Sequence, residues 1–373
     1  MKLRQRNVTR RDFLKATTCG LLGGIVALNV RGDMAGPVSS GTQSQAALVK
    51  GETRADNIFK ALKMIEGDIK KGLAKKKRIV IKPNMVGVNR QLCASHADCL
   101  EGILEFLKPM VKDEVIIAES PGGAPAVEGY ENYGYFRLKK KFKVRFLDLD
   151  EGPFTIRYVT DQRFHAQPAR FSRLLLDPDT YIISSAVLKT HDRFVVTLSL
   201  KNIVVGAAIK DRGFRWGTAG RGKKNDKPII HGGRGNEGGN YNLFMLAERL
   251  HPDLAVIDGF QGMEGNGPMG GTPVDHKVAI ASTDWLAADR IAVELMGFDF
   301  AKIGYLWFAA QAGLGQGDLS KIDILGEKVE DHIRNYRPHV NIERQYRWIE
   351  GPYALNQRAT GAHFSAVAGS GIG

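Results

Sequence analysis

Cysteine is scarce in this chain of 373 residues, which contains three. Cys19 lies near the N-terminus, so Cys93 and Cys99 are the two that remain for the body of the protein. Two thiolates are too few to hold an iron–sulfur cluster, and none is expected from this chain alone. In an oxidising compartment the pair predicts either a disulfide across a short loop or two buried free thiols.

Long hydrophobic runs and nucleic-acid motifs are also lacking. The uncharged stretch at residues 16–30 is shorter than the roughly 20 residues that a membrane-spanning helix needs. No helix-turn-helix, zinc-finger spacing or aromatic RNA-binding strand accompanies the net charge of +13, which argues against a nucleic-acid partner. Residues 1–50 supply +6 of that charge. The body is therefore only moderately basic, a balance that permits anionic ligands.

The N-terminal segment resembles a twin-arginine signal peptide. Its sequence TRRDFLK, at residues 9–15, precedes the apolar stretch. We expect residues 1–47 to form the signal peptide and a linker, with the mature start between residues 32 and 47. Such a signal predicts a periplasmic or extracytoplasmic protein that engages the twin-arginine translocase, anchored if the signal stays uncleaved. Export in the folded state is typical of proteins that first bind a cofactor.

Short β-branched runs alternate with helical patterns through the body of the chain. This alternation predicts an α/β fold with a mainly parallel, Rossmann-like sheet and helices on both faces. We expect one such domain over residues 52–326, followed by a C-terminal extension at 327–373 that is partly disordered. Residues 151–177 depart from the pattern and predict a hairpin or an insertion. The predicted strands are 78–82, 115–119, 144–148, 181–188, 254–258, 277–282 and 322–326, and the predicted helices are 55–73, 99–111, 241–250, 285–296 and 301–312.

Ligands of parallel α/β sheets gather at the carboxyl ends of the strands, and polar residues follow several of the predicted strands. Lys82, Lys189 and Lys201 are predicted to bind a small anion, because a lysine ammonium suits phosphate or carboxylate. Asn84 and Asn202 are predicted to orient that ligand through their amides. The alternative is that the three lysines are simply solvated.

Carboxylates near the same strand ends indicate a second kind of chemistry. Asp258, Asp284 and Asp289 are predicted as oxygen ligands of a divalent metal such as Mg²⁺ or Mn²⁺. His191, Asp258 and Glu264 are predicted as catalytic acid–base residues. Other roles stay open, since Asp284 is also suited to cap a helix and Asp289 to form a buried salt bridge.

A glycine-rich basic segment at residues 210–240 contains eight Lys or Arg, three Asp or Glu and nine Gly. This composition predicts a lid-like insertion over an anionic ligand, or else a surface loop. His231 is its residue best suited to move a proton near neutral pH. Two glycine motifs, at 217–223 and 265–270, imitate nucleotide-binding loops but lack the strand and helix that such loops need. A standard nicotinamide site is therefore not expected.

Six segments together resemble the family catalogued as domain of unknown function 362, over roughly residues 52–326. The resemblance implies that the polar strand ends form one site. Some relatives carry cysteine-rich cluster motifs and the redox chemistry that these imply, but this chain lacks those cysteines. The segments are Lys82-Pro83-Asn84, Leu188 to His191, Leu200 to Gly206, Ile257-Asp258-Gly259, Met263 to Pro268, and Asp284 with Asp289.

Two functions agree with these observations. The first is an exported enzyme that acts on a small anionic substrate with a divalent metal. The second is a non-catalytic cofactor-binding or maturation protein that serves a partner redox enzyme. A catalyst requires a titratable group with a pKa near the working pH, whereas a carrier requires only tight retention of its ligand.

Overall fold

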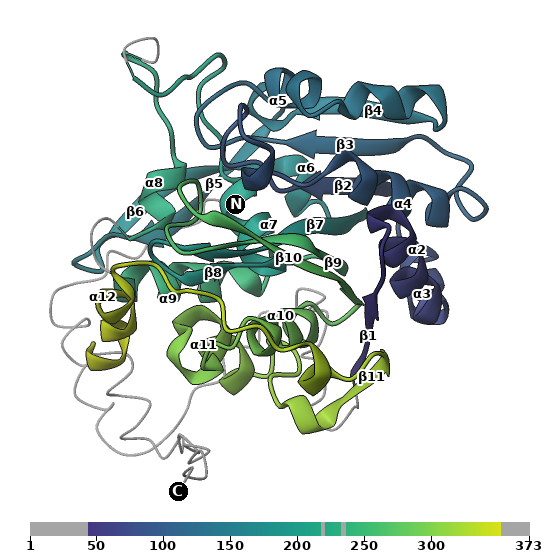
Figure 1. Cartoon of the computed structure of the whole chain (residues 1–373). Helices are drawn as coiled ribbons and strands as arrows, with labels where there is room; N and C mark the ends of the chain where they lie inside the picture. Colours follow the sequence, from purple (N-terminus) through teal and green to yellow (C-terminus); the bar gives the residue numbers. More distant parts are fainter. Residues whose placement is uncertain (1–43, 218–220, 233–235, 352–373) are drawn as a thin grey trace, which may run out of the picture. The chain divides into compact units, whose positions relative to one another are not determined.

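The centre of the fold is a sheet in which, among the residues described, nine strands pair (Figure 1). The order is β11-β1-β10-β9-β7-β2-β3-β4, with β8 paired to β7. Neighbours from β9 to β4 run parallel, as do β1 and β11, whereas β10 is antiparallel to β9 and β1. The predicted mainly parallel, Rossmann-like sheet is confirmed. Its strands are β1 (Ser44–Lys50), β2 (Arg78–Pro83), β3 (Val115–Glu119), β4 (Val144–Asp148), β7 (Thr180–His191), β8 (Val195–Thr197), β9 (Leu254–Glu264), β10 (Thr272–Ser282) and β11 (Ile322–Gly326).

A computed structural model describes residues 44–217, 221–232 and 236–351 of the chain. The predicted twin-arginine signal and the tail predicted to be disordered, 358–373, lie outside the described residues. Within the described ranges, no helix combines the length and the apolar character needed to cross a bilayer.

Helices cover both faces of the sheet because alternate strand residues point to opposite sides. On β2, Val80 belongs to one hydrophobic core and Ile81 to the other. The predicted helix 55–73 is two helices that meet at Ile65. One face carries α2 (Arg54–Met64), α3 (Glu66–Leu73), α4 (Ala97–Leu107) and α5 (Ala126–Asn132); the other carries α7 (Ser199–Ala207), α9 (Asn236–Ala247), α10 (Trp285–Leu295) and α11 (Gly304–Gln311).

The folded body extends beyond both ends of the predicted domain. Strand β1 precedes residue 52 and lies between β10 and β11, with Leu48 fully buried. Residues 327–351, predicted as part of a C-terminal extension, pack against the body through α12 (Ile342–Tyr346). Within that segment Trp348 is buried, and its indole nitrogen donates to the carbonyl of Lys302 at 2.8 Å.

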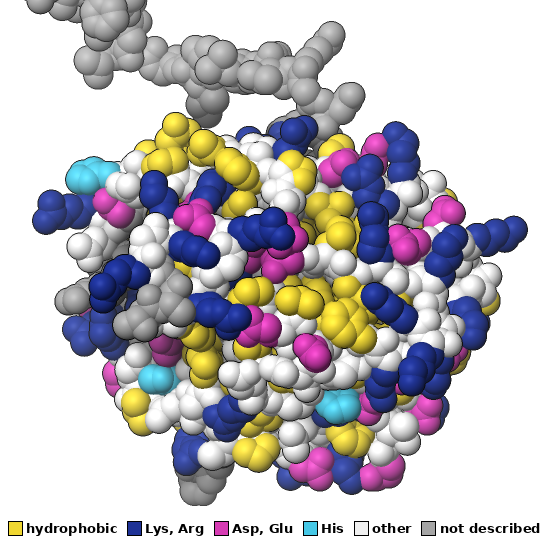
Figure 2. All heavy atoms as spheres, turned by 90° about the horizontal axis from the view of Figure 1, so that it is seen from above, with side chains coloured by type: hydrophobic (Ala, Val, Ile, Leu, Met, Phe, Trp, Pro, Cys, Tyr) yellow, Lys and Arg dark blue, Asp and Glu magenta, His cyan; other side chains and the backbone are white. Residues whose placement is uncertain are grey.

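The segment at 151–177 forms the hairpin that its sequence predicts. Strands β5 (Phe154–Thr160) and β6 (Ala166–Ser172) pair antiparallel as a separate two-stranded sheet, followed by the short helix α6 (Arg173–Leu176). Cys93 and Cys99 are buried free thiols, which is one of the two states that the sequence leaves open. Figure 2 shows one face of the molecule, on which basic and acidic side chains are interspersed.

Candidate functional site

A cavity of about 590 Å³ lies at the carboxyl ends of β2, β3 and β7. This size is ordinary for a small-molecule site, and the position is the one expected for ligands of parallel α/β sheets. Part of the basic glycine-rich segment lines the cavity, including Trp216 and the short helix α8 (Lys227–Ile230). The predicted insertion therefore lies beside the site, although its residues 218–220 and 233–235 are outside the described ranges.

The structure brings five of the predicted site residues to this cavity. They come from three elements that meet at the sheet edge: β2 and the turn after it, the end of β7, and the helix α7. The other five, Lys189, Asp258, Glu264, Asp284 and Asp289, do not line it. The five that do are Lys82, Asn84, His191, Lys201 and Asn202.

The ammonium group of Lys82 is fully used by protein acceptors. Its Nζ donates to the carboxylate of Glu119, to the backbone carbonyl of Pro83 and to Oδ1 of Asn202, each at 2.8 Å. Burial lowers the pKa of Lys82, and the negative charge of Glu119 opposes that change. Because an ammonium group has three donors, none remains for a ligand. Lys82 therefore holds Glu119 and Asn202 in place beside the cavity and has no donor left for a ligand.

This ion pair fixes the orientation of two amides. Because Lys82 donates to Oδ1 of Asn202, that oxygen must be the acceptor, and it also accepts from Nδ2 of Asn84 at 3.1 Å. Because Nδ2 of Asn84 faces Asn202, the carbonyl oxygen of the Asn84 side chain points away from Asn202. It is buried and has no hydrogen-bond partner in the described part of the chain. A buried acceptor without a partner costs free energy, so this oxygen favours a ligand that donates a hydrogen bond.

Two buried lysines of the cavity, Lys201 and Lys227, form no ion pair with a carboxylate of the described residues; Lys227 donates to backbone carbonyls, whereas no hydrogen bond with these residues engages the ammonium group of Lys201. The side chain of Lys201 is 5% exposed, and no carboxylate of residues 44–217, 221–232 or 236–351 lies within ion-pairing distance of it. Its Nζ lies 5.5 Å from the ring centre of Phe194. Burial, followed by repulsion from Lys189, lowers the pKa of Lys201 to about 7. An anion in the cavity would supply the missing negative charge.

Helix α7 carries Lys201 and is held at its N-terminus by Asp289. The carboxylate of Asp289 accepts from the backbone N–H and the hydroxyl of Ser199 and from the N–H of Leu200. These N–H groups have no partner within the helix, so the carboxylate satisfies them. Burial raises the pKa of Asp289 to about 7. Among the described residues, Asp289 therefore binds a helix terminus and forms neither a salt bridge nor part of a metal-binding group.

Replacing Asp289 by Ala is expected to lower the free energy of unfolding by about 1–2 kcal/mol, the usual loss for a helix cap. Denaturant unfolding of the purified protein checks this value. Asp299→Ala is a matched control, because Asp299 also caps with its carboxylate, but on a short, exposed 3-10 turn. Equal losses in the two variants would contradict the role assigned to Asp289.

Two histidines of the cavity have complementary tautomers. Nδ1 of His231 lies 2.8 Å from the carbonyl of Lys227, which can only accept, so this nitrogen carries the proton and Nε2 is an acceptor. Nδ1 of His191 lies 3.0 Å from the N–H of Arg193 and 3.1 Å from a carboxylate oxygen of Asp192. With Nδ1 accepting from that N–H, the proton of the neutral ring lies on Nε2. The rings stack 6.0 Å apart. Burial lowers the pKa of His231 to about 3 and that of His191 well below its usual value, so both are neutral.

Lys189 lies below the cavity and is fully buried. Its Nζ donates to the carbonyl of Cys93 at 3.1 Å, and burial lowers its pKa to about 8. The predicted cluster of three lysines therefore forms only in part. Lys201 lines the cavity with its ammonium available, Lys82 lines it with its ammonium fully bonded, and Lys189 contributes charge from beneath.

The predicted metal ligands do not come together as one site. Asp258 pairs with Arg54 at 3.0 Å, whereas Asp284 caps α10 and accepts from the N–H of Gln316. Asp289 binds the start of α7, as described above. Within the described ranges, no group of three His, Cys, Asp or Glu is arranged to hold a metal ion. The donor set predicted for Mg²⁺ or Mn²⁺ therefore does not fit such an ion, because each carboxylate already binds another group of the protein.

The predicted acid–base residues Asp258 and Glu264 also lie away from the cavity. Asp258 accepts from Arg54 and from the N–H of Phe260, and burial raises its pKa. Glu264 ends β9 and accepts from the backbone N–H of Arg337 at 3.0 Å. Among the three predicted catalytic residues, His191 is the one that lines the cavity.

Glu119 and Lys227 are site residues that the sequence analysis missed. Glu119 ends β3, so the rule used for the other strand ends applies to it equally well. Lys227 lines the cavity wall and donates to the carbonyls of Val205, Gly206 and Ala208 at the end of α7. A cation at that position satisfies carbonyls that a helix leaves without partners. No local sequence pattern marks Lys227, because its partners follow from the tertiary fold.

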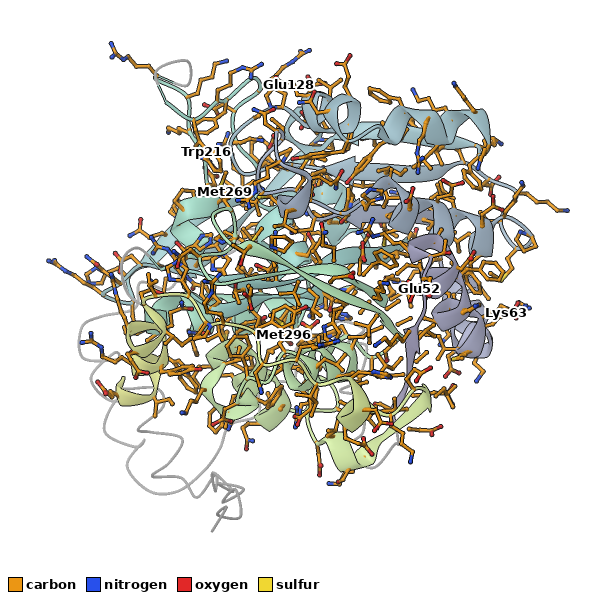
Figure 3. All side chains as sticks on the ribbon, viewed as in Figure 1. Glu52, Lys63, Glu128, Trp216, Met269 and Met296 are labelled. Carbon is orange, nitrogen blue, oxygen red and sulfur yellow. The ribbon has the colours of Figure 1, made fainter. Side chains whose placement is uncertain are left out.

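The mouth of the cavity combines two exposed apolar side chains with the partly exposed, charged Asp192 and Arg193. Trp216 and Met269 line it and are 50% and 39% exposed, and Figure 3 shows them on the same side of the molecule. Met269 belongs to the loop between β9 and β10, which contains the glycine motif 265–270. That loop joins two antiparallel strands and leads into no helix, as expected from the sequence. Apolar side chains at the mouth suit a ligand with a small hydrocarbon part.

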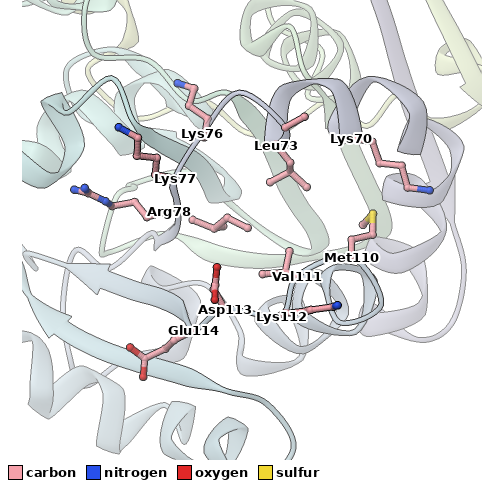
Figure 4. Close-up of a pocket in the computed structure, with 12 residues that line it drawn as sticks. Lys70, Leu73, Lys76, Lys77, Arg78, Met110, Val111, Lys112, Asp113 and Glu114 are labelled. Carbon is pink, nitrogen blue, oxygen red and sulfur yellow. The ribbon is translucent and has the colours of Figure 1, made fainter.

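A second cavity, of about 560 Å³, lies at the opposite ends of the strands (Figure 4). Four of its five lysines and arginines pair with carboxylates, and the fifth, Lys112, is exposed to solvent. Lys76 binds Asp253, and Arg78 binds Asp177, at 2.9 and 2.8 Å. These side chains are also more exposed than Lys201. The first cavity is therefore the better candidate for a functional site.

Comparison with known proteins places this cavity within a family domain. Residues 79–294 match the model of a domain of unknown function, DUF362. A thylakoid-associated protein of Synechocystis sp. is 27% identical over 240 residues, which are 64% of this chain and 68% of that protein. A crystal structure of a Thermotoga maritima protein aligns with a TM-score of 0.38 and 13% identity. That alignment covers 71% of this chain and 59% of the other chain.

Proposed function

The chain belongs to the DUF362 family, and we propose that its cavity binds a small organic anion as the substrate of an enzyme. The observation that carries this proposal is the buried ammonium group of Lys201, which lines the cavity without a carboxylate partner in the described part of the chain. A buried charge without a partner is costly, and a ligand anion compensates that cost. Such an arrangement is favourable in a binding site, because the ligand anion offsets the free-energy cost of the buried charge.

The surrounding groups indicate what else the anion contains. The free oxygen of Asn84 favours a hydrogen-bond donor, and Trp216 and Met269 at the mouth favour a short apolar part. The proton on His191 and the bare nitrogen of His231 supply an acid and a base on the same wall. A hydroxy or oxo carboxylate of a few carbon atoms has the features that these groups recognise.

Lys201→Met tests the proposal. We expect this variant to bind lactate at least tenfold more weakly than the wild-type protein, because the cation is lost. Stability should not fall, since methionine fills a similar volume and removes a buried charge. Calorimetric titration with lactate and thermal unfolding without ligand provide the two readouts. Equal lactate affinity in variant and wild type would refute the proposal.

Lys63→Met is a matched control for this experiment. Lys63, on α2, has an exposed side chain that pairs with Glu66 at the start of α3, and it lies on the far side of the molecule from Trp216 (Figure 3). This variant should keep the lactate affinity of the wild type. A loss of affinity in both variants would show that nonspecific charge, and not Lys201, governs the binding.

We also propose that the protein is exported in folded form by the twin-arginine route. The support is the Arg10-Arg11 pair followed by the apolar stretch. Because β1 begins at Ser44 inside the sheet, a cleavage that preserves the fold should precede that residue. Replacing both arginines by lysine is expected to leave the full chain in the cytoplasmic fraction of an expressing bacterium. Normal export of that variant would refute the route.

A further inference from the structure

Lys201 has the surroundings of an amine nucleophile. Its side chain is nearly buried, and its Nζ lies 5.5 Å from the centre of the Phe194 ring. No carboxylate of the described residues forms an ion pair with it, and the charge of Asp192, which also lines the cavity, favours the ammonium form less than burial and Lys189 disfavour it. Two further lysines, Lys189 and Lys82, add positive charge nearby and disfavour its protonated form. A lysine in apolar surroundings beside other cations is the kind that reacts with carbonyl groups.

We propose that Lys201 forms an imine with the carbonyl carbon of a small 2-oxo acid bound in the cavity. This inference rests on the proposed function and names its substrate class. The protonated imine retains the positive charge of the lysine, so the adjacent carboxylate of a 2-oxo acid keeps its counter-charge throughout. A simple aldehyde or ketone lacks that carboxylate and leaves the buried cation without a partner.

The protonation state of Lys201 suits the reaction. Burial and the neighbouring lysines lower the pKa of its ammonium group to about 7. In the protein without ligand, a large fraction of the side chain is therefore a free amine near neutral pH, and this is the form that a 2-oxo acid must meet in order to react. An exposed lysine with a pKa of about 10.4 is almost entirely protonated. At pH 7.5 this difference alone makes the reactive fraction of Lys201 several hundred times larger.

The two histidines account for the proton transfers. The amine nitrogen attacks the carbonyl carbon, a C–N bond forms, and the π electrons of the carbonyl move to its oxygen. The nitrogen then gives one proton to Nε2 of His231, which is an acceptor. The oxygen takes that proton and one from solvent, delivered through Nε2–H of His191, and leaves as water. Amine, carbonyl and one proton thus give a protonated imine and one water molecule.

Trapping with borohydride tests this inference. The full chain is incubated with pyruvate and sodium borohydride at pH 7.5, and peptide mass spectrometry measures N-(1-carboxyethyl) modification at each lysine. Lys201 is expected to react at least tenfold faster than Lys63, an exposed lysine of α2. Modification of Lys201 no faster than that of Lys63 would overturn the inference.

Lactate separates this inference from the proposed function. It has the carboxylate of pyruvate but no carbonyl, so it should bind and slow the trapping of Lys201 without forming an adduct itself. If lactate binding depends on Lys201 and pyruvate still gives no adduct, the imine is wrong and anion binding stands. If neither compound binds, both proposals fail. Lys201→Arg, which keeps a positive charge, should bind lactate and give no adduct at residue 201.

Discussion

Replacing Lys82 by Met is expected to lower the free energy of unfolding by about 3–5 kcal/mol at pH 7, the usual cost of leaving one member of a buried ion pair alone. The variant leaves the carboxylate of Glu119, which is 1% exposed, without its cation. It also removes a hydrogen-bond donor from Oδ1 of Asn202. Urea unfolding followed by circular dichroism measures the loss. The same substitution at Lys201 removes a charge that has no protein partner and should leave stability unchanged or higher.

The pH dependence of the Lys82→Met variant gives an independent check. Burial raises the pKa of Glu119 above its usual value, and the attraction of Lys82 opposes that rise. Without Lys82, Glu119 binds a proton more tightly in the folded state than in the unfolded state. The free energy of unfolding that the variant loses relative to the wild type should therefore become smaller as the pH falls toward 5. Adding Glu119→Leu should restore much of the lost stability at pH 7. An equal loss in the free energy of unfolding at pH 5 and pH 7 would contradict this account.

Lys63→Met supplies the comparison for an exposed pair. Lys63 and Glu66 are 2.6 Å apart, but the lysine side chain is 59% exposed. Solvent screens such a pair, and its loss should cost less than about 1 kcal/mol. If the Lys63 and Lys82 variants lost similar stability, Lys82 would return to the role that the sequence predicted, that of a direct anion ligand.

The sheet was predictable because its strands carry continuous apolar runs. The runs at 115–119, 144–148 and 322–326 became strands with the same bounds. Strand β1 was missed because its sequence, SQAALVK, follows a polar linker and has no strong strand pattern of its own. Its pairing with β10 and β11 decides its conformation. Contacts between distant segments override weak local preference in this case.

The candidate site was predictable only as far as strand ends are visible in the sequence. Lys82, Asn84 and His191 follow or end buried strands, and the cavity forms there. The carboxylates predicted as metal ligands lie apart from one another, and the sequence could not show this because position in the chain does not reveal which partner each carboxylate binds. Asp258 meets Arg54, from a helix far earlier in the chain, and Asp289 meets the start of α7. Those partners depend on packing between helices and sheet, which no local pattern encodes.

The affinity for a small carboxylate is expected to fall as the pH rises above 7. In the free protein the pKa of Lys201 is lowered to about 7, whereas a bound anion must raise it, since opposite charge favours the ammonium form. Binding therefore takes up a proton at alkaline pH. By linkage the affinity should decrease by up to about tenfold for each pH unit, or about a hundredfold from pH 7.5 to 9.5. Calorimetric titration with lactate, whose own charge is constant over this range, measures it.

Lys201→Arg separates this titration from others in the same range. Arginine stays charged at these pH values, so the variant should keep a nearly constant affinity up to pH 9. Burial lowers the pKa of Lys189 to about 8 and that of Lys227 to about 7, so both titrate in the same interval. Both lysines are present in the two proteins, so they cannot account for a difference between them. The histidines are neutral throughout and contribute no proton uptake. If the arginine variant loses affinity as steeply as the wild type, the proton belongs to Lys189 or Lys227, and Lys201 is not the cation that binds the anion.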